Sequence, residues 1–252
     1  GGQTAQVRSE QPRTQVLDKM TELYWNDVSK QWRVRPRESM LHARVGFGCA
    51  LFKGRSHLVV SGGFAPDFNP TAKTEYFSLG ENKWHRARDM NVARTAHSMC
   101  EAANGRFVYA FGGQGANASP LTSIERVPIP QVTLFLAWLL VLLADVKLPE
   151  PICNVGCYPI SNSEILLYGG LDKDAREVSS GRVMICIQDA HSFLEEQVSL
   201  TIKDCFPNTA LVQTDTRKAG SIFVMGKQGV HRLDLSDPTK RRFFLEFQPE
   251  LP

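Results

Sequence analysis

Four short apolar runs recur along the chain, and each of them ends at a glycine. They occupy residues 58–61, 108–111, 165–168 and 222–225, directly before Gly62, Gly112, Gly169 and Gly226. A continuous apolar run of this length, bounded by turn residues, is typical of a strand buried on both faces. Each run closes a unit of constant length, and the four units cover residues 44–62, 94–112, 151–169 and 208–226.

The strand before each apolar run carries small residues on one face. Counting back from the glycine, alternate positions hold Gly46, Ala96, Cys153 and Ala210, then Gly48, Ser98, Val155 and Val212, then Ala50, Cys100, Cys157 and Thr214. Because strand side chains alternate between faces, a uniformly small face predicts crowding by the matching strands of the other units. This strand is therefore expected to lie innermost. In the second unit, Asn104-Gly105 predicts a tight hairpin turn.

Two outer strands follow the glycines. A polar loop leads to a third strand, expected at residues 21–26, 74–79, 123–128, 182–187 and 230–235. A fourth strand opens on an aromatic residue, at Trp32, Trp84, Trp138, Phe193 and either Phe243 or Phe244. The pattern predicts an all-β protein made of repeated four-stranded units.

Four strands per unit, with a double glycine after the second strand, resemble the kelch repeat, whose period is about 50 residues. The double glycines are Gly62-Gly63, Gly112-Gly113 and Gly169-Gly170, and Met40-Leu-His-Ala-Arg44 stands beside Met90-Asn-Val-Ala-Arg94. The resemblance covers essentially the whole chain. It weakens where Phe193 replaces tryptophan and Gly226-Lys227 replaces the glycine pair. It implies a kelch-type β-propeller, in which each unit is a four-stranded blade around a central channel.

We expect one kelch propeller domain over residues 1–252, with units at about residues 1–37, 38–88, 89–144, 145–200 and 201–252. The strands at Leu23 and Trp32 have no inner partners within the chain, and the C-terminus ends on an outer strand. The prediction is four complete blades plus a half blade, an open segment cut from a longer propeller.

Residues 132–144 form an apolar stretch whose one polar member is Thr133. A membrane-spanning helix needs about 20 residues. We interpret the stretch as a core strand with an insertion rather than as a membrane element. An interface with a missing blade or a partner, and an error in the translated sequence, remain open alternatives.

The composition indicates a globular protein with a substantial core. The chain has 252 residues, of which 42% are hydrophobic and 22% charged, and its net charge is +3. No dense basic run argues for nucleic acid. The six cysteines lack the paired spacing of a zinc site. With no signal peptide in evidence, reduced thiols in a cytoplasmic protein are expected.

No catalytic motif is evident in the sequence. It contains neither G-x-S-x-G, H-E-x-x-H nor a phosphate-binding loop, and its six histidines fall in different positions of the repeat. The double glycines each lead to another strand rather than to a helix, so we assign them a backbone role. We therefore predict a non-enzymatic protein without cofactor or metal. The alternatives are an oxidase-like or carbohydrate-active propeller enzyme and a purely structural domain.

The resemblance suggests where a partner protein would bind. In kelch propellers that bind partners, rim loops form the ligand surface, and the arginine that opens the inner strand often faces an acidic peptide. Arg44 and Arg94 match that position, whereas Pro151 and Asn208 replace it in the other units. Bracing of adjacent blades is the alternative role for both arginines. The other candidates are Phe64 and Asp67 in the loop 64–72, and Gln114 in the loop 114–120.

Overall fold

The computed structural model describes residues 2–6, 13–52, 56–102, 107–128, 147–161, 163–178, 181–187, 190–193, 212–213, 221–226, 229–234 and 242–247. Within these ranges the chain is all-β. The strands form six small antiparallel sheets, and a single-turn 3-10 helix, η1 (Ala116–Ala118), lies in a loop within one of them. None of the described helical structure is long or apolar enough to cross a membrane.

Three of these sheets have four strands, which pair in the order in which they follow along the chain. They consist of β5 (Gly48–Phe52), β6 (His57–Ser61), β7 (Thr74–Ser78) and β8 (Lys83–Arg86); β12 (Gly156–Ser161), β13 (Glu164–Tyr168), β14 (Gly181–Ile187) and β15 (Ala190–Phe193); and β16 (Val212–Gln213), β17 (Ser221–Gly226), β18 (Gly229–Asp234) and β19 (Arg242–Phe247). The predicted four-stranded unit is therefore confirmed.

A further sheet has three described strands, β9 (Ser98–Ala102), β10 (Phe107–Phe111) and β11 (Ile124–Pro128). The predicted turn at 104–105 and the apolar stretch 132–144, with its Trp138, lie outside the described residues.

One predicted strand boundary is wrong. Phe193 ends β15 instead of opening it, because pairing with β14 already begins at Ala190.

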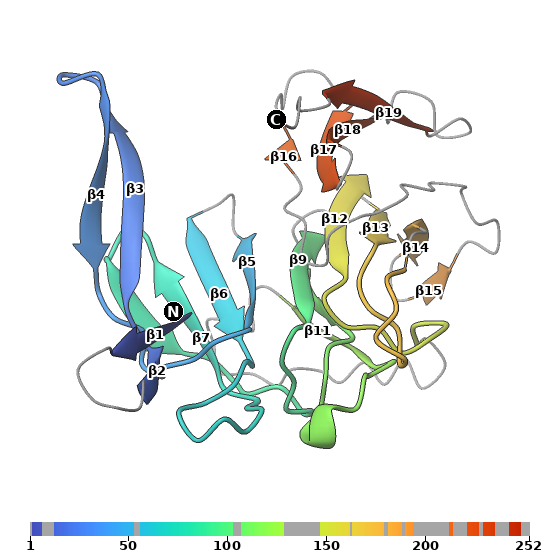
Figure 1. Cartoon of the computed structure of the whole chain (residues 1–252), viewed down its shortest axis with the longest axis horizontal. Coiled ribbons are helices and arrows are strands. Elements are labelled where there is room, and N and C mark those ends of the chain that lie inside the picture. Colours follow the sequence, from blue (N-terminus) through green and yellow to red (C-terminus); the bar gives the residue numbers. More distant parts are fainter. Residues whose placement is uncertain are drawn as a thin grey trace.

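The first strands of three sheets are neighbours. β5 lies beside β9, and β9 lies beside β12. Figure 1 shows these three strands near the middle of the molecule, with β13, β14 and β15 successively farther out. A Cβ atom on Gly48 would approach Met99 Cγ of the adjacent sheet to 2.8 Å. The prediction that this strand is innermost and crowded is confirmed for these sheets.

In the third unit, the alignment of the repeats obtained by counting back from the glycine is wrong by one residue. Gly156 pairs with Tyr168, the residue before the glycine pair, as Ser98 pairs with Phe111 in the second unit. The hairpin of β12 and β13 is thus one residue shorter. Tyr158 consequently takes a position that was expected to be small. The fourth unit is also displaced, since Val212 pairs with Phe223, three residues before Gly226.

The hydrophobic core lies between successive sheets. One cluster packs β5 and β6 against β9 and β10; its largest members are Phe52, Val59, Met90, Met99 and Val108. A second cluster packs β9 and β10 against the β12–β13 sheet and contains Tyr109, Phe111, Ile152, Ile165 and Leu167. These two clusters stabilise the β5–β8, β9–β11 and β12–β15 sheets through contact with their neighbours.

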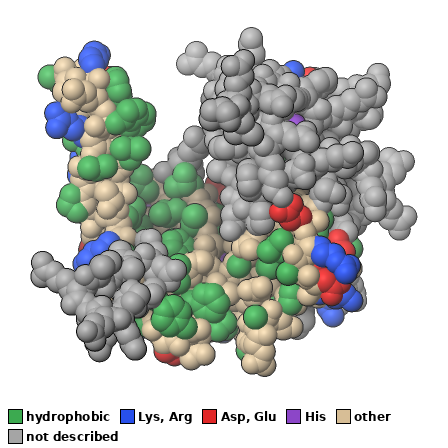
Figure 2. Space-filling model, in the orientation of Figure 1, with side chains coloured by type: hydrophobic (Ala, Val, Ile, Leu, Met, Phe, Trp, Pro, Cys, Tyr) green, Lys and Arg blue, Asp and Glu red, His purple; other side chains and the backbone are tan. Residues whose placement is uncertain are grey.

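The N-terminal part forms two separate hairpins. β1 (Gly2–Gln6) pairs with β2 (Arg13–Leu17), and β3 (Met20–Asn26) pairs with β4 (Gln31–Arg37). Among the described residues, β3 and β4 have no inner strands beside them, as predicted. The β3–β4 hairpin projects from the other sheets (Figure 1) and carries hydrophobic side chains along its length (Figure 2). Its Trp32 is 63% exposed and its Val34 68%.

The double glycines meet the backbone of the next sheet. Gly112 and Gly113 have φ of +55° and +90°, and a Cβ on Gly112 would collide with the carbonyl oxygen of Ile152. The N–H of Gly113 donates to that same oxygen at 2.9 Å. Gly62-Gly63 makes the equivalent contacts with the carbonyl oxygen of Arg94. The predicted backbone role of the glycines is confirmed, because a side chain there would separate adjacent sheets.

We expect Gly112→Ala to lower the free energy of unfolding by about 2–4 kcal/mol, since it adds a steric collision to an unfavourable φ. Urea denaturation measures the loss. Gly80→Ala is the matched control, because a Cβ atom on Gly80 would meet no atom within 4 Å and its backbone is not left-handed. Equal stability of the two variants would contradict a tight junction between sheets.

Candidate functional site

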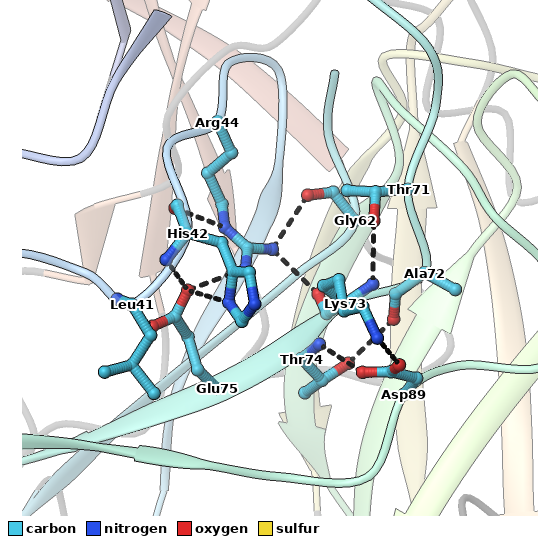
Figure 3. Close-up of polar contacts among 10 residues, drawn as sticks. All are labelled: Leu41, His42, Arg44, Gly62, Thr71, Ala72, Lys73, Thr74, Glu75 and Asp89. Carbon is cyan, nitrogen blue, oxygen red and sulfur yellow. Dashed lines mark hydrogen bonds and ion pairs between the residues drawn. The ribbon is translucent and has the colours of Figure 1, made fainter. Parts of the chain in front are cut away.

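Arg44 precedes β5, and its side chain is fully buried. Its Nη1 donates to the carbonyl oxygens of Gly62 at 2.9 Å and Lys73 at 2.7 Å, and its Nη2 donates to Glu75 Oε1 at 2.6 Å (Figure 3). Burial lowers the pKa of Arg44, and the Glu75 carboxylate opposes this shift. The guanidinium thus ties the end of β6 and the start of β7 to the segment that enters β5.

Arg94 repeats this arrangement before β9. Its Nη1 donates to the carbonyl oxygens of Gly112 at 2.8 Å and Ser123 at 3.0 Å, and its Nη2 donates to Glu125 Oε1 at 2.7 Å. Both side chains of this ion pair are fully buried. Burial lowers the pKa of Arg94, again opposed by its carboxylate partner. Two successive sheets therefore contain the same charged pair.

The two carboxylates also accept hydrogen bonds from backbone amide groups. Glu75 accepts the amide N–H groups of residues 41–42 at 2.5 and 3.3 Å. Glu125 accepts those of residues 91–92 at 2.8 and 3.1 Å. Each carboxylate is therefore satisfied by one guanidinium and two amides, as a buried charge requires.

The arginines and the glycine pairs form a relay of hydrogen bonds from sheet to sheet. Arg44 binds the carbonyl oxygen of Gly62, and the N–H of Gly63 donates to the carbonyl oxygen of Arg94 at 2.9 Å. Arg94 in turn binds the carbonyl oxygen of Gly112, and Gly113 donates to Ile152. Each arginine thus fixes the position of one glycine pair. That glycine pair is in turn hydrogen-bonded to the segment that enters the following sheet.

The structure shows Arg44 and Arg94 bracing strands within their own sheets, whereas the alternative to partner binding given by sequence analysis was bracing between adjacent blades. Neither side chain is accessible, and a carboxylate from a partner would have to displace Glu75 or Glu125. Sequence analysis missed these two glutamates. A signal for them was present, because each follows its arginine by 31 residues.

The other predicted residues lie at the same end of their sheets as the glycine pairs. Phe64 and Gln114 are equivalent: each is half-buried and forms one backbone bridge to the segment that enters the first strand, at Val45 and Thr95, and one across its own loop, at Pro70 and Pro120. Asp67 is exposed at the tip of its loop. Hydrogen bonds from Asn69 lower the pKa of Asp67. The loops are thus anchored at their bases and present polar groups at their tips.

A groove lies beside the Arg44 brace, between the end of β8, the start of β7 and the segment that enters β5. We call it the basic groove; its lining residues are His42, Lys73, Thr74, Arg86, Ala87, Arg88 and Asp89, and its volume is about 240 Å³. Lys73 Nζ pairs with Asp89 Oδ2 at 2.6 Å (Figure 3). Sequence analysis missed this groove, since it combines three segments. The alternation of Arg86 and Arg88 was its one local signal.

A buried histidine lies between the β5–β8 sheet and the β9–β11 sheet. His97 Nε2 is 3.2 Å from Ser61 Oγ, and its Nδ1 has no hydrogen-bond partner in the described structure. Burial, reinforced by the positive charges of Arg94 and Arg44, lowers the pKa of His97 well below its ordinary value. His97 is therefore a neutral packing residue at neutral pH.

Within the described residues, no group of three or more His, Cys, Asp or Glu side chains is arranged to hold a metal ion.

Neither a protein-family model nor a curated protein sequence matches the chain. Among solved structures, 276 chains match. One of them, described as "Structure of YjhT", has 13% sequence identity and a TM-score of 0.54, with 69% of this chain and 51% of that chain covered. This chain thus spans about half the length of that structure. At this identity the likeness concerns the fold alone.

We expect Arg94→Met to lower the free energy of unfolding by about 3–5 kcal/mol, because Glu125 is left buried without its cation. The loss in Arg94→Met/Glu125→Gln should be smaller than the sum of the two single losses. Urea denaturation of the four proteins gives the coupling energy. The exposed pair of Arg35 and Glu22, 2.6 Å apart, is the control and should couple much more weakly. Similar coupling in both cycles would contradict the bracing role.

The neutral state of His97 predicts a pH dependence of stability. The folded pKa is depressed, whereas the unfolded chain titrates near 6.5, so the unfolded state binds the extra proton in acid. Stability is complete above about pH 6.5 and falls below it, by up to about 1.4 kcal/mol per pH unit. Urea denaturation at pH 7.5 and at pH 5.5 should show a smaller loss in His97→Gln. An unchanged loss in His97→Gln would refute the assignment.

Proposed function

We propose that the chain is a kelch-type β-propeller segment, with four complete blades and a half blade, that acts as a non-enzymatic scaffold for binding another protein. The observation that carries the proposal is the relay of buried hydrogen bonds. It fixes the bases of the loops 64–72 and 114–120 and leaves their tips exposed. Rigid scaffolds that present exposed loops are a common basis of protein recognition.

Several features support the propeller assignment. Three sheets keep the same strand order, and the first strands β5, β9 and β12 lie side by side. The three glycine pairs have the same left-handed conformation, and Gly62-Gly63 and Gly112-Gly113 make the same contact with the following sheet. A solved structure with a TM-score of 0.54 shares the fold over 69% of the chain. Repetition of a sheet about an inner row of strands is the architecture of a propeller.

The rim loops are the proposed binding surface. Phe68 is 49% exposed beside Asp67, and both residues lie at the tip of the first loop. Phe64 and Gln114 anchor the two loops at equivalent positions. An exposed aromatic residue beside a charged one suits recognition of a protein surface. The proposal assigns no catalytic residue, cofactor or metal, and it places the protein in the cytoplasm, where its four described free thiols would stay reduced.

Substitution at the loop tip tests this function. We expect Asp67→Arg to reduce recovery of a partner in affinity capture at least about fivefold, because it reverses the charge at the centre of the surface. Glu81→Arg is the matched control: Glu81 is equally exposed, but it lies in the turn at the opposite end of β7. Quantitative mass spectrometry of the captured proteins gives the ratio. Partners that are retained by Asp67→Arg, or lost equally with Glu81→Arg, would count against the rim.

A further inference from the structure

We propose that the basic groove binds a doubly charged oxyanion of the phosphoryl type, either free or on a peptide side chain. The groove lies beside the rim loops, because Lys73 directly follows the loop 64–72. If the anion is carried by a peptide, the inference rests on the proposed function of binding another protein. A free phosphate ion requires no partner protein.

The charges of the groove are unbalanced. Lys73, Arg86 and Arg88 stand against the single carboxylate of Asp89. That carboxylate is occupied, since its Oδ2 accepts from Lys73 Nζ at 2.6 Å and its Oδ1 from the N–H of Thr74 at 3.2 Å. Arg86 and Arg88 are exposed and form no ion pair with a described residue. Two guanidinium groups therefore remain for a ligand of charge −2.

The brace behind the groove does not neutralise these arginines. Glu75 is fully buried and directs its carboxylate to Arg44 and to the amides of residues 41–42. His42 Nδ1 lies 3.6 Å from Glu75 Oε1, beyond hydrogen-bond distance. The buried pair of Arg44 and Glu75 carries no net charge. The excess positive charge therefore belongs to the lining of the groove.

The second unit shows which of these residues the fold requires. It keeps the arginine, the glutamate and the glycine pair of the first unit at the same spacing. Three groove residues have uncharged counterparts there: His42, Lys73 and Thr74 correspond to Val92, Ser123 and Ile124. The brace of the second unit thus forms without a histidine or a lysine at these positions, so the fold does not require His42 and Lys73 there. Both side chains are available for a ligand.

The size and spacing suit one small anion. A volume of about 240 Å³ is smaller than the roughly 300–1,000 Å³ of pockets for drug-sized ligands. Arg86 is the last residue of β8 and Arg88 follows it by two residues, and both exposed side chains line the groove. Guanidinium groups donate paired hydrogen bonds to phosphoryl oxygens. Two of them at this spacing can grip one tetrahedral oxyanion from two directions.

Isothermal titration calorimetry of the full chain at low salt tests the inference with three probes: inorganic phosphate, a short peptide with one phosphoserine, and the same peptide with glutamate. We expect the phosphoserine peptide to bind at least about tenfold more tightly than the glutamate peptide, because its charge is larger. Binding of inorganic phosphate would identify a free ion as a sufficient ligand. Its absence, with the phosphopeptide bound, would identify a partner side chain.

Three variants locate the binding. Arg86→Gln/Arg88→Gln should weaken it at least about tenfold, whereas Lys30→Gln/Lys83→Gln, which removes two exposed charges outside the groove, should leave it within about twofold. Asp89→Asn should strengthen it about threefold, since the competing carboxylate is lost. No binding of any probe, equal affinity for both peptides, or equal effects of the two double variants would overturn the proposal. Loss of partner capture in Asp67→Arg tests the rim separately.

Discussion

The buried contact between a guanidinium group and a carboxylate is the interaction on which the arrangement of the sheets depends. An isolated charge in this interior would be strongly unfavourable. Arg44 and Arg94 are tolerated because each meets a carboxylate and two carbonyl oxygens. The same bonds join three strands of one sheet and position the glycine pair against the next. The charged pair therefore determines where successive sheets meet as well as how each sheet is held.

Comparison of the first three units indicates that the arginine and the glutamate are present together or absent together. In the third unit Ile152, rather than Pro151, takes the place of the arginine, since it receives the N–H of Gly113. The position of the glutamate changes at the same time, because Leu167 pairs with Arg182 as Val60 pairs with Glu75. The arginine–glutamate pair of the first two units is thus absent at these positions of the third unit. Apolar packing of Ile152 replaces the ionic brace there.

The sequence predicted features that depend on local pattern. The apolar runs, the innermost strands and the special backbone of Gly62 and Gly112 follow from strand periodicity and glycine chemistry. The direction of Arg44 did not follow, because its partner Glu75 lies in another strand and only the register brings them together. The basic groove was hidden for the same reason. Residue counting also failed in the third unit, where the hairpin is a residue shorter and every position of β12 counted back from the glycine is displaced to the other face.

The β3–β4 hairpin differs from the other sheets in how its edges are protected. β4 carries Pro36 and several arginines, which discourage pairing along an outer edge, whereas β3 has no proline or lysine. Its ladder is also supported by little burial, since Leu23 is 61% exposed. Two-stranded ribbons are marginal in water on their own. Amide protons of this ribbon should consequently exchange with solvent long before those at the glycine junctions. The edge of β3, which pairs with no strand other than β4 among the described residues, makes the ribbon a starting point for polymerisation between copies of the chain.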